Sequence, residues 1–278
     1  MNIAVVGLGL IGGSLAKSIK ARTLHTVYGI DRDEETMMLA RLCGAIDNRL
    51  SRESLPECDL FLLAVRPQSA VDWLSEHAQD IRKNAIVVDM CGVKRAVCEK
   101  MIPLAEKYGF AYIGGHPMAG KERGGFVNSS DDLFDRASMI LTPNEHTDMR
   151  ILETLKELFT DIGFADLTFT TPEEHDRIIA YTSQLAHITS SAYVKSPDAQ
   201  RRRGFSAGSF RDMTRVARLD ENMWTELMMD NADYLTDQLG ILIEHLQEYK
   251  TALLERDEKT LCALLKDGRE KKATAGGN

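Results

Sequence analysis

The chain has few cysteines, and none of them is in a metal-binding or redox arrangement. Its 278 residues include five cysteines, with no CxxC pair and no histidine at the spacing of a zinc ligand. We therefore interpret the cysteines as reduced thiols of a cytoplasmic protein and expect no metal site. No apolar run approaches the roughly 20 residues that a membrane helix needs, and the N-terminus lacks the pattern of a signal peptide. A membrane location is therefore not expected.

Positive charge is also in deficit. The sequence has 34 Lys and Arg against 42 Asp and Glu, which gives a formal net charge of -8. This balance argues against nonspecific binding to nucleic acid. The overall field would also repel an anionic substrate, so binding one requires a local cluster of Arg or Lys.

Short apolar runs alternate with helical patterns over the first 170 residues, which predicts an α/β domain with a parallel sheet and helices on both faces. The predicted strands are Ile3–Val6, Thr26–Ile30, Leu60–Val65, Ala85–Asp89, Ala111–Gly114, Ser138–Leu141 and Ala165–Phe169. After residue 170 the strand signals stop, and Thr171-Pro172-Glu173-Glu174 has the pattern of a helix start. We therefore predict two domains, 1–170 and 171–278, the second of them all-α. Its helices are expected to run to about Lys195 and then over Asn222–Leu239, Ile241–Glu255 and Asp257–Lys266.

A glycine-rich segment separates the first predicted strand from the helix after it. It has the pattern GxGxxG and consists of Gly7, Leu8, Gly9, Leu10, Ile11 and Gly12. In this pattern the first glycine permits a tight turn, the second lets the backbone approach a pyrophosphate, and the third lets the helix pack on the strand. The helix N-terminus also offers free N–H groups to phosphates.

An acidic residue stands where the dinucleotide fingerprint has one. The second strand ends in Asp31, 19 residues after Gly12, and its carboxylate can accept hydrogen bonds from the ribose hydroxyls. Domain 1–170 is therefore predicted to be a Rossmann-type domain. Asp31 would repel a 2′-phosphate, which favours NAD over NADP. The adjacent Arg32 could partner such a phosphate, but we interpret it as a solvent-exposed or adenine-stacking part of the cofactor site.

His116 follows the fifth predicted strand within a segment bounded by Gly114 and Gly120. Ligands of open α/β sheets bind beyond the carboxyl ends of the strands. A histidine there has a suitable pKa to take the proton of a hydroxyl group when hydride leaves the same carbon. Position alone fits a structural loop histidine equally well.

A polar stripe lies on the helix predicted after Thr171. Its members follow the spacing of a single helical face and are Asp176, Ala180, Ser183 and His187. For the helix alone, a solvated face is the simpler interpretation. The other histidines have no supporting pattern and are interpreted as surface residues: His25, His77, His146, His175 and His245.

Because the net charge is negative, binding an anionic substrate would require a local cluster of Arg or Lys. Residues 201–215 contain such a cluster. Arg211 and Arg215 belong to this segment, and a guanidinium fork can donate two parallel hydrogen bonds to a carboxylate. Arg215 is expected to begin a helical stretch that continues to Trp224. The run Arg201–Arg203 is more simply a solvated loop.

Four segments together resemble the prephenate dehydrogenase family, which includes the arogenate and cyclohexadienyl dehydrogenases. They are GLGLIGGS, GGHPMAGKERGG, TSQLAH and SAGSFRDMTRVARLDENMW. The resemblance implies NAD-dependent oxidative decarboxylation of prephenate to 4-hydroxyphenylpyruvate in tyrosine biosynthesis, or of arogenate to tyrosine, and no motif decides between the two substrates. It also implies a homodimer formed through the helical domain.

The resemblance further implies roles for single residues. His116 corresponds to the catalytic histidine that takes the hydroxyl proton, and His187 and Ser183 correspond to residues of the substrate pocket. Arg215 corresponds to the arginine that binds a substrate carboxylate, and Glu122 to a glutamate that can pair with it and gate entry. Neighbouring pocket or supporting positions correspond to Arg211, Asp212 and Trp224.

One departure concerns the turn after the fourth strand. The family has a GSVK-type turn whose serine contacts the catalytic histidine, and here the turn is Cys91-Gly92-Val93-Lys94. The hydrogen bond that orients His116 is then expected from Ser183, water or Cys91. A 3-hydroxyacid or imine reductase of similar two-domain plan would explain the glycine loop but not His116 and Arg215 in their motifs, and a nucleotide-sensing protein would have no need of His116.

Overall fold

The computed structural model describes residues 1–205 and 207–275, and within them eight strands form one sheet in the order β3-β2-β1-β4-β5-β6-β7-β8. All pairs are parallel except β6 with β7, which are antiparallel. The order from β3 to β6 is that of a dinucleotide-binding fold, so the predicted Rossmann-type class is confirmed. The strands are β1 (Asn2–Val6), β2 (Thr26–Ile30), β3 (Asn48–Arg49), β4 (Leu60–Leu63), β5 (Ile86–Asp89), β6 (Ala111–Pro117), β7 (Ser138–Thr142) and β8 (Asp166–Phe169).

The sequence prediction was incomplete at two strands. It missed β3, which has only two residues, and it gave no direction for β7, which is antiparallel to β6. A parallel pair normally needs a crossover helix. The segment between β6 and β7 contains only the 3-10 turn Phe126–Asn128, so β7 returns beside β6 in the opposite direction.

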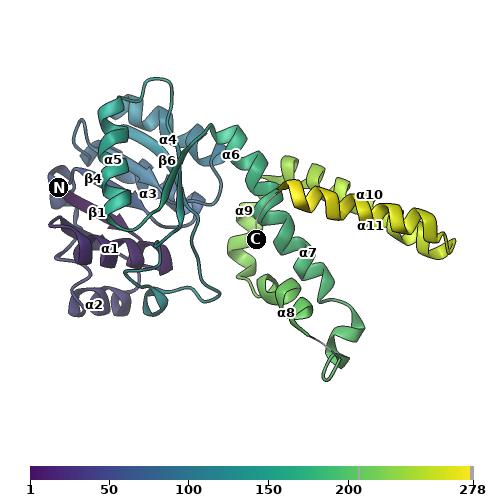
Figure 1. Cartoon of the computed structure of the whole chain (residues 1–278). Coiled ribbons are helices and arrows are strands. Elements are labelled where there is room, and N and C mark those ends of the chain that lie inside the picture. The colour runs from purple at the N-terminus through teal and green to yellow at the C-terminus, as the bar shows by residue number, and fades with distance from the viewer. Residues whose placement is uncertain (206, 276–278) are drawn as a thin grey trace. The chain divides into compact units, whose positions relative to one another are not determined.

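Helices cover both faces of the sheet (Figure 1). Successive side chains of a strand point to opposite faces, so Ile3 and Val5 pack in the cluster with α1, α2 and α5, whereas Ala4 and Val6 pack in the cluster with α3 and α4. These two apolar layers fix the strand ends that carry the site. The helices are α1 (Leu10–Arg22), α2 (Glu34–Leu42), α3 (Pro67–His77), α4 (Arg95–Tyr108) and α5 (Met149–Asp161).

The helical part begins as predicted, because the Thr171 side chain accepts a hydrogen bond from the Glu174 amide at 3.2 Å. The predicted single helix contains a π-helical turn at Ala180–Gln184. A π turn holds more residues than an α turn, so the expected common face of the polar stripe is interrupted. The helices of this part are α6 (Pro172–Ile179), α7 (Leu185–Tyr193), α8 (Gly208–Thr214) and α9 (Glu221–Met229).

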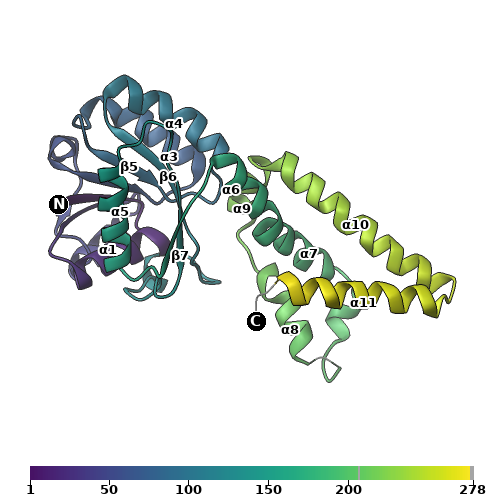
Figure 2. The same ribbon diagram turned by 45° about the horizontal axis from the view of Figure 1, so that its top comes forward.

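Two compact units divide the chain, Met1–Asn231 and Ala232–Asn278. The second is a helical hairpin of α10 (Ala232–Leu254) and α11 (Glu258–Ala275), seen in Figure 2. The predicted helix break between Leu239 and Ile241 is wrong, since α10 continues through Gly240. The division at residue 170 stays a prediction. Among the described residues, no helix combines the length and apolar character that crossing a membrane requires.

Candidate active site

The glycine loop joins β1 to α1 in the geometry that its sequence predicts. Gly7 has a φ of +85°, a conformation that residues with a Cβ rarely adopt. A Cβ on Gly12 would lie 1.8 Å from the carbonyl oxygen of Gly7, so only glycine fits there. A Cβ on Gly9 would meet nothing within 4 Å, which leaves open space beside the first turn of α1.

The N-terminus of α1 is free of a side-chain cap, since Gly9 occupies the capping position. The first N–H groups of a helix have no acceptor within it, so the amides of Leu10 and Ile11 are available to phosphate oxygens. Asp31, at the end of β2, accepts hydrogen bonds from the amides of Leu8 at 2.7 Å and Asp33 at 3.0 Å. Each carboxylate oxygen keeps a lone pair for a ribose hydroxyl. These residues fit a dinucleotide, and Arg32 next to them is exposed.

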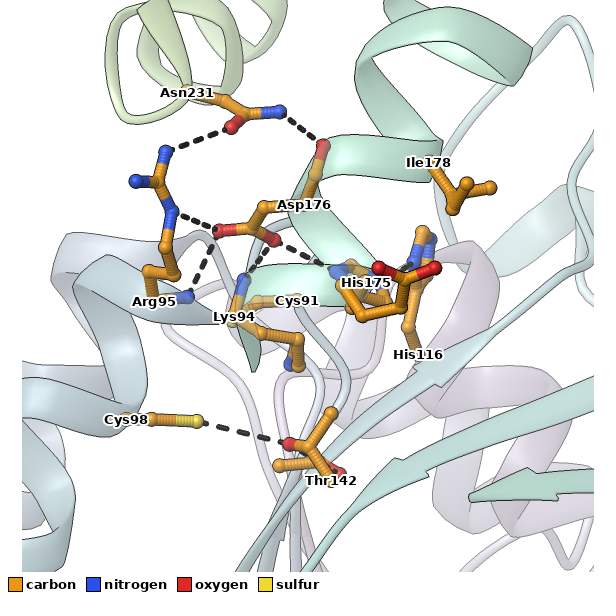
Figure 3. A network of polar contacts seen from close by, with 12 residues as sticks. Cys91, Lys94, Arg95, Cys98, His116, Thr142, His175, Asp176, Ile178 and Asn231 are labelled. Carbon is orange, nitrogen blue, oxygen red and sulfur yellow. Dashed lines mark hydrogen bonds and ion pairs between the residues drawn. The ribbon is translucent and has the colours of Figure 1, made fainter. Parts of the chain in front are cut away.

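His116 lies at the end of β6, where it is half-buried and bonded to a second histidine (Figure 3). Its Nδ1 lies 2.8 Å from Nε2 of His175. Nδ1 of His175 lies 2.7 Å from Oδ1 of Asp176. His175 is 2% exposed and Asp176 is fully buried. The interpretation of His175 as a surface residue is therefore wrong, and the three side chains form a continuous hydrogen-bonded chain.

The Asp176 carboxylate is fixed by the N-terminus of α4. Its oxygens accept hydrogen bonds from the amides of Lys94 at 2.8 Å and Arg95 at 2.9 Å. The carbonyl of Asp176 accepts a hydrogen bond from the Asn231 side chain at 2.8 Å, and Asn231 also donates to Gln184 in the π turn. The start of a helix favours negative charge, so this carboxylate is both held in place and stabilised as an anion.

Lys94 ties the strand that carries His116 to the neighbouring strand. Its side chain is fully buried, forms an ion pair with Asp89 at the end of β5, and donates to the carbonyl of Gly115 at 2.6 Å. Tyr112 donates to the same Asp89 carboxylate at 2.6 Å. Burial alone would lower the pKa of Lys94, but Asp89 raises it above its ordinary value. The ammonium therefore stays charged and anchors the residue before His116.

Burial keeps the imidazoles neutral. It is the largest cause that holds the pKa of His116 well below its ordinary value, and His175 and Lys94 add to the effect. Burial also lowers the pKa of His175, against the hydrogen bond to Asp176, which opposes the shift. For Asp176, burial alone would raise the pKa, but the hydrogen bonds from His175, Arg95 and Lys94 lower it. At neutral pH the chain consists of two neutral imidazoles and one carboxylate.

The other nitrogen of His116 faces the turn after β5. A Cβ on Gly92 would lie 3.9 Å from Nε2 of His116 and 3.3 Å from a methyl carbon of Leu227 in α9. The position that corresponds to the family's serine thus lies beside Nε2 of His116, with Leu227 next to it. The expectation that Ser183 or Cys91 orients His116 is wrong, because the bond to Nδ1 comes from His175 and Cys91 points to the carbonyl of Val65.

A third histidine, His187, stacks on a residue of α9. His187 lies against Trp224 of α9 with ring centroids 3.8 Å apart, and its Nδ1 donates to the carbonyl of Ser183 at 2.9 Å. Trp224 and Leu227 are three residues apart, so they are neighbours on the surface of α9. One helix therefore joins His187 to the surroundings of His116.

The predicted substrate-binding charges lie on exposed segments. Arg211 is in the last turn of α8, and Arg215 follows in the 3-10 turn Arg215–Ala217, which packs against α7. The expected helix from Arg215 to Trp224 is wrong, because α9 begins only after Asp220 caps it. Glu122 is exposed on the loop after β6, and in the described part of the chain it forms no ion pair with Arg215. The roles of these three residues stay predictions.

Sequence reasoning missed His175, although a signal existed. His175 and Asp176 stand side by side near the start of a helix that begins soon after the last strand. An aspartate directly after a histidine can orient the imidazole, so this pair is more informative than an isolated histidine. Among the described residues, no group of three His, Cys, Asp or Glu is placed to hold a metal ion.

The glycine loop, Asp31 and the neutral His116 at the end of β6 define the class of dinucleotide-dependent dehydrogenases with a helical second part. Residues 15–165 match the family model of the prephenate dehydrogenase nucleotide-binding domain, and residues 171–267 match that of the prephenate dehydrogenase dimerization domain. The chain belongs to the prephenate dehydrogenase family. The predicted resemblance is confirmed, and membership of this family sets aside the hydroxyacid or imine reductase and the nucleotide-sensing alternatives.

The similarity to known proteins extends over nearly the whole length of the chain. Prephenate dehydrogenase of Bacillus subtilis (strain 168) is 30% identical over 97% of this chain and 74% of its own length. The structure of Aquifex aeolicus prephenate dehydrogenase in complex with hydroxyphenyl propionate and NAD+ is 27% identical, with a TM-score of 0.82 over 99% of this chain and 98% of that one. Synechocystis arogenate dehydrogenase is 28% identical, with a TM-score of 0.82 over 99% of this chain and 100% of that one.

Proposed function

We propose that this chain is an NAD-dependent prephenate dehydrogenase, which converts prephenate to 4-hydroxyphenylpyruvate and carbon dioxide. The observation that carries the proposal is the neutral imidazole of His116, bonded through Nδ1 and held at the end of β6, on the same edge of the sheet as the dinucleotide-type glycine loop after β1. Relatives named prephenate dehydrogenase support the substrate. The arogenate alternative is not favoured over it.

The residues of the site fit this reaction. The glycine loop and Asp31 would hold the pyrophosphate and the adenosine ribose of NAD, whose nicotinamide would supply the hydride acceptor. As hydride leaves the ring carbon that bears the hydroxyl, Nε2 of His116 accepts the hydroxyl proton and lets its oxygen carry developing charge. The bond between the ring and its carboxylate breaks, and its electron pair completes the aromatic ring as carbon dioxide leaves.

The remaining predicted residues orient the substrate in this proposal. Arg215 binds a carboxylate of prephenate, with Arg211 next to it on α8, because a guanidinium fork matches a carboxylate. The stacked pair of His187 and Trp224, with Ser183 one turn away, forms a wall of the pocket. Glu122 closes the entrance on the loop after β6.

We also infer that two copies form a homodimer through the helical part, in agreement with the description of the matching dimerization domain. Leu246 and Leu253 of α10 are seven residues apart, share one side of the helix and are 57% and 61% exposed. Apolar side chains in such a row favour burial against a partner. A cytoplasmic location is part of the same proposal.

The test is a turnover comparison with two substrates and two cofactors. Purified enzyme is given prephenate or arogenate with NAD or NADP, and reduction of the cofactor is followed by absorbance. The highest kcat/KM is expected for prephenate with NAD. A higher kcat/KM for arogenate would reassign the substrate, a preference for NADP would contradict the role of Asp31, and no reduction in any combination would overturn the proposal.

A further inference from the structure

We propose that His175 is a positioning residue, which holds His116 in the tautomer with its proton on Nδ1 and so leaves Nε2 as the proton acceptor. The inference deepens the proposed function, on which its kinetic part rests. It concerns a residue that touches neither substrate nor cofactor in the proposed reaction and acts only through His116.

The argument begins at the Asp176 carboxylate. This group is fully buried and accepts hydrogen bonds from the amides of Lys94 and Arg95 at the start of α4. An ionised carboxylate can only accept hydrogen bonds. The nitrogen of His175 that lies 2.7 Å from Oδ1 must therefore carry a proton, which assigns that proton to Nδ1.

The assignment then passes along the chain to His116. A neutral imidazole has one N–H donor and one acceptor nitrogen. With the proton of His175 on Nδ1, its Nε2 is the acceptor, so the partner 2.8 Å away, Nδ1 of His116, must be the donor. The proton of neutral His116 is thereby on Nδ1, and Nε2 has a free lone pair.

Burial supports the neutral form of His175 that this assignment requires. The residue is 2% exposed, and the charged groups nearest to it are Asp176 in α6, Lys94 at the start of α4 and Asp89 at the end of β5. Asp89 and Lys94 neutralise each other in a buried ion pair. The pKa of His175 lies below its ordinary value, with burial as the largest cause.

The arrangement also serves the proton transfer. When Nε2 takes the hydroxyl proton, His116 becomes a cation that still donates through Nδ1 to His175. His175 donates in turn to the Asp176 anion, so the positive charge is stabilised through two hydrogen bonds and no further proton has to move. Hydrogen bonds that end on an ionised group are the stronger kind.

The first experiment reads the tautomer directly in the free enzyme. Histidine labelled with nitrogen-15 is incorporated, and the two ring nitrogens of His116 are assigned by comparison with His116→Asn. A protonated Nδ1 and a bare Nε2 near neutral pH are expected in the wild type. A proton on Nε2 would overturn the proposal whatever the enzyme's substrate proves to be, because this measurement needs neither substrate nor cofactor.

The second experiment compares two substitutions of His175. In His175→Gln the longer amide can present an acceptor to His116, whereas in His175→Asn the shorter amide can reach Asp176 but not His116. We expect His175→Asn to lower kcat roughly 10²-fold, the lower end of what a positioned general base contributes, with KM for prephenate and Kd for NAD changed little. His175→Gln is expected to recover most of kcat and to keep the Nδ1 proton of His116.

The exposed His146, changed to Asn, serves as the matched control and is expected to leave kcat unchanged. Thermal unfolding separates a folding defect from a positioning defect. Equal loss of kcat in both His175 variants with an unchanged His116 tautomer would show a merely structural role, and full activity of His175→Asn would also overturn the proposal. Absence of prephenate turnover in the wild type would refute the proposed function while leaving the tautomer measurement decisive for His175.

Discussion

At the scale of single residues, the environment of His116 determines which of its two ring nitrogens is free to accept a proton. Nδ1 is occupied by His175, whereas Nε2 lies beside the unsubstituted Cα of Gly92. An imidazole in this setting remains neutral where a free histidine would begin to protonate, because burial keeps the pKa of His116 well below its ordinary value. His116 is therefore expected to be unprotonated at neutral pH.

This environment predicts the pH dependence of the reaction. Only neutral His116 can accept a proton, and its pKa lies below 6.5, so kcat/KM should fall with decreasing pH only below pH 6.5. His116→Asn should lower kcat by roughly 10²–10⁴-fold while NAD still binds. The measurements are a pH profile of kcat/KM and a titration with NAD. A decline that begins above pH 6.5, or near-normal kcat in the variant, would contradict the assignment of His116 as the base.

At the scale of elements, two glycines of the β1–α1 junction, Gly12 and Gly9, have different structural roles. Gly12 is enclosed, since an added Cβ would strike the Gly7 carbonyl at 1.8 Å, whereas Gly9 has nothing within 4 Å and an ordinary φ of -69°. One position therefore serves the packing of helix on strand, and the other keeps space for a ligand.

Alanine at these two positions should separate the two tasks. Gly12→Ala is expected to lower the free energy of unfolding by at least about 2 kcal/mol, because neither backbone segment can move away without cost. Gly9→Ala should change it by less than about 1 kcal/mol but weaken NAD binding, since the methyl group occupies the approach to the pyrophosphate. Denaturant unfolding and NAD titration check both. Similar effects of the two variants on stability would contradict the separation.

The periodicity of apolar residues predicted the long, amphipathic helices and strands. It was less informative where tertiary contacts override the local preference of a residue. The main strands and the start of α6 follow from apolar runs and the Thr171 cap. The π turn could not be predicted from local pattern, and the bonds of its buried Gln184 to Asn231 and to the carbonyl of Leu227 are tertiary contacts. The same holds for His175, whose partners are 59 residues away in β6 and at its side in α6. Gly240 led to the wrong prediction of a helix end in α10. A glycine lowers helix stability by about 1 kcal/mol relative to alanine, but α10 continues through it.

At the scale of the whole molecule, both parts of the chain match one family in the order that the sequence predicts. The cofactor loop, the base and the segment with Arg211 and Arg215 come from distant parts of the chain. Their motifs identified the family well, because each motif reflects a local chemical requirement. The contacts of Glu122 and Arg215 with a substrate are not determined by motif alone, since both side chains are exposed.

The proposed homodimer makes a prediction about mass. Light scattering with size exclusion should give twice the mass of one chain, and replacing Leu246 and Leu253 together by Glu should shift the protein toward the monomer, because buried carboxylates without partners are costly. Lys259→Glu, at an exposed position of α11, controls for added negative charge. A monomeric wild type, or a dimer that survives the double substitution, would contradict this use of α10.

The carboxylate of Asp176 performs two tasks with one set of oxygens. It fastens the first turn of α4 to α6, and it terminates the imidazole chain that runs through His175 to His116. The position of α4 and the orientation of the His116 imidazole therefore depend on the same carboxylate. We expect a substitution that breaks the contact between Asp176 and α4 to lower enzymatic activity while the sheet stays folded, even where the substituted residue touches no ligand.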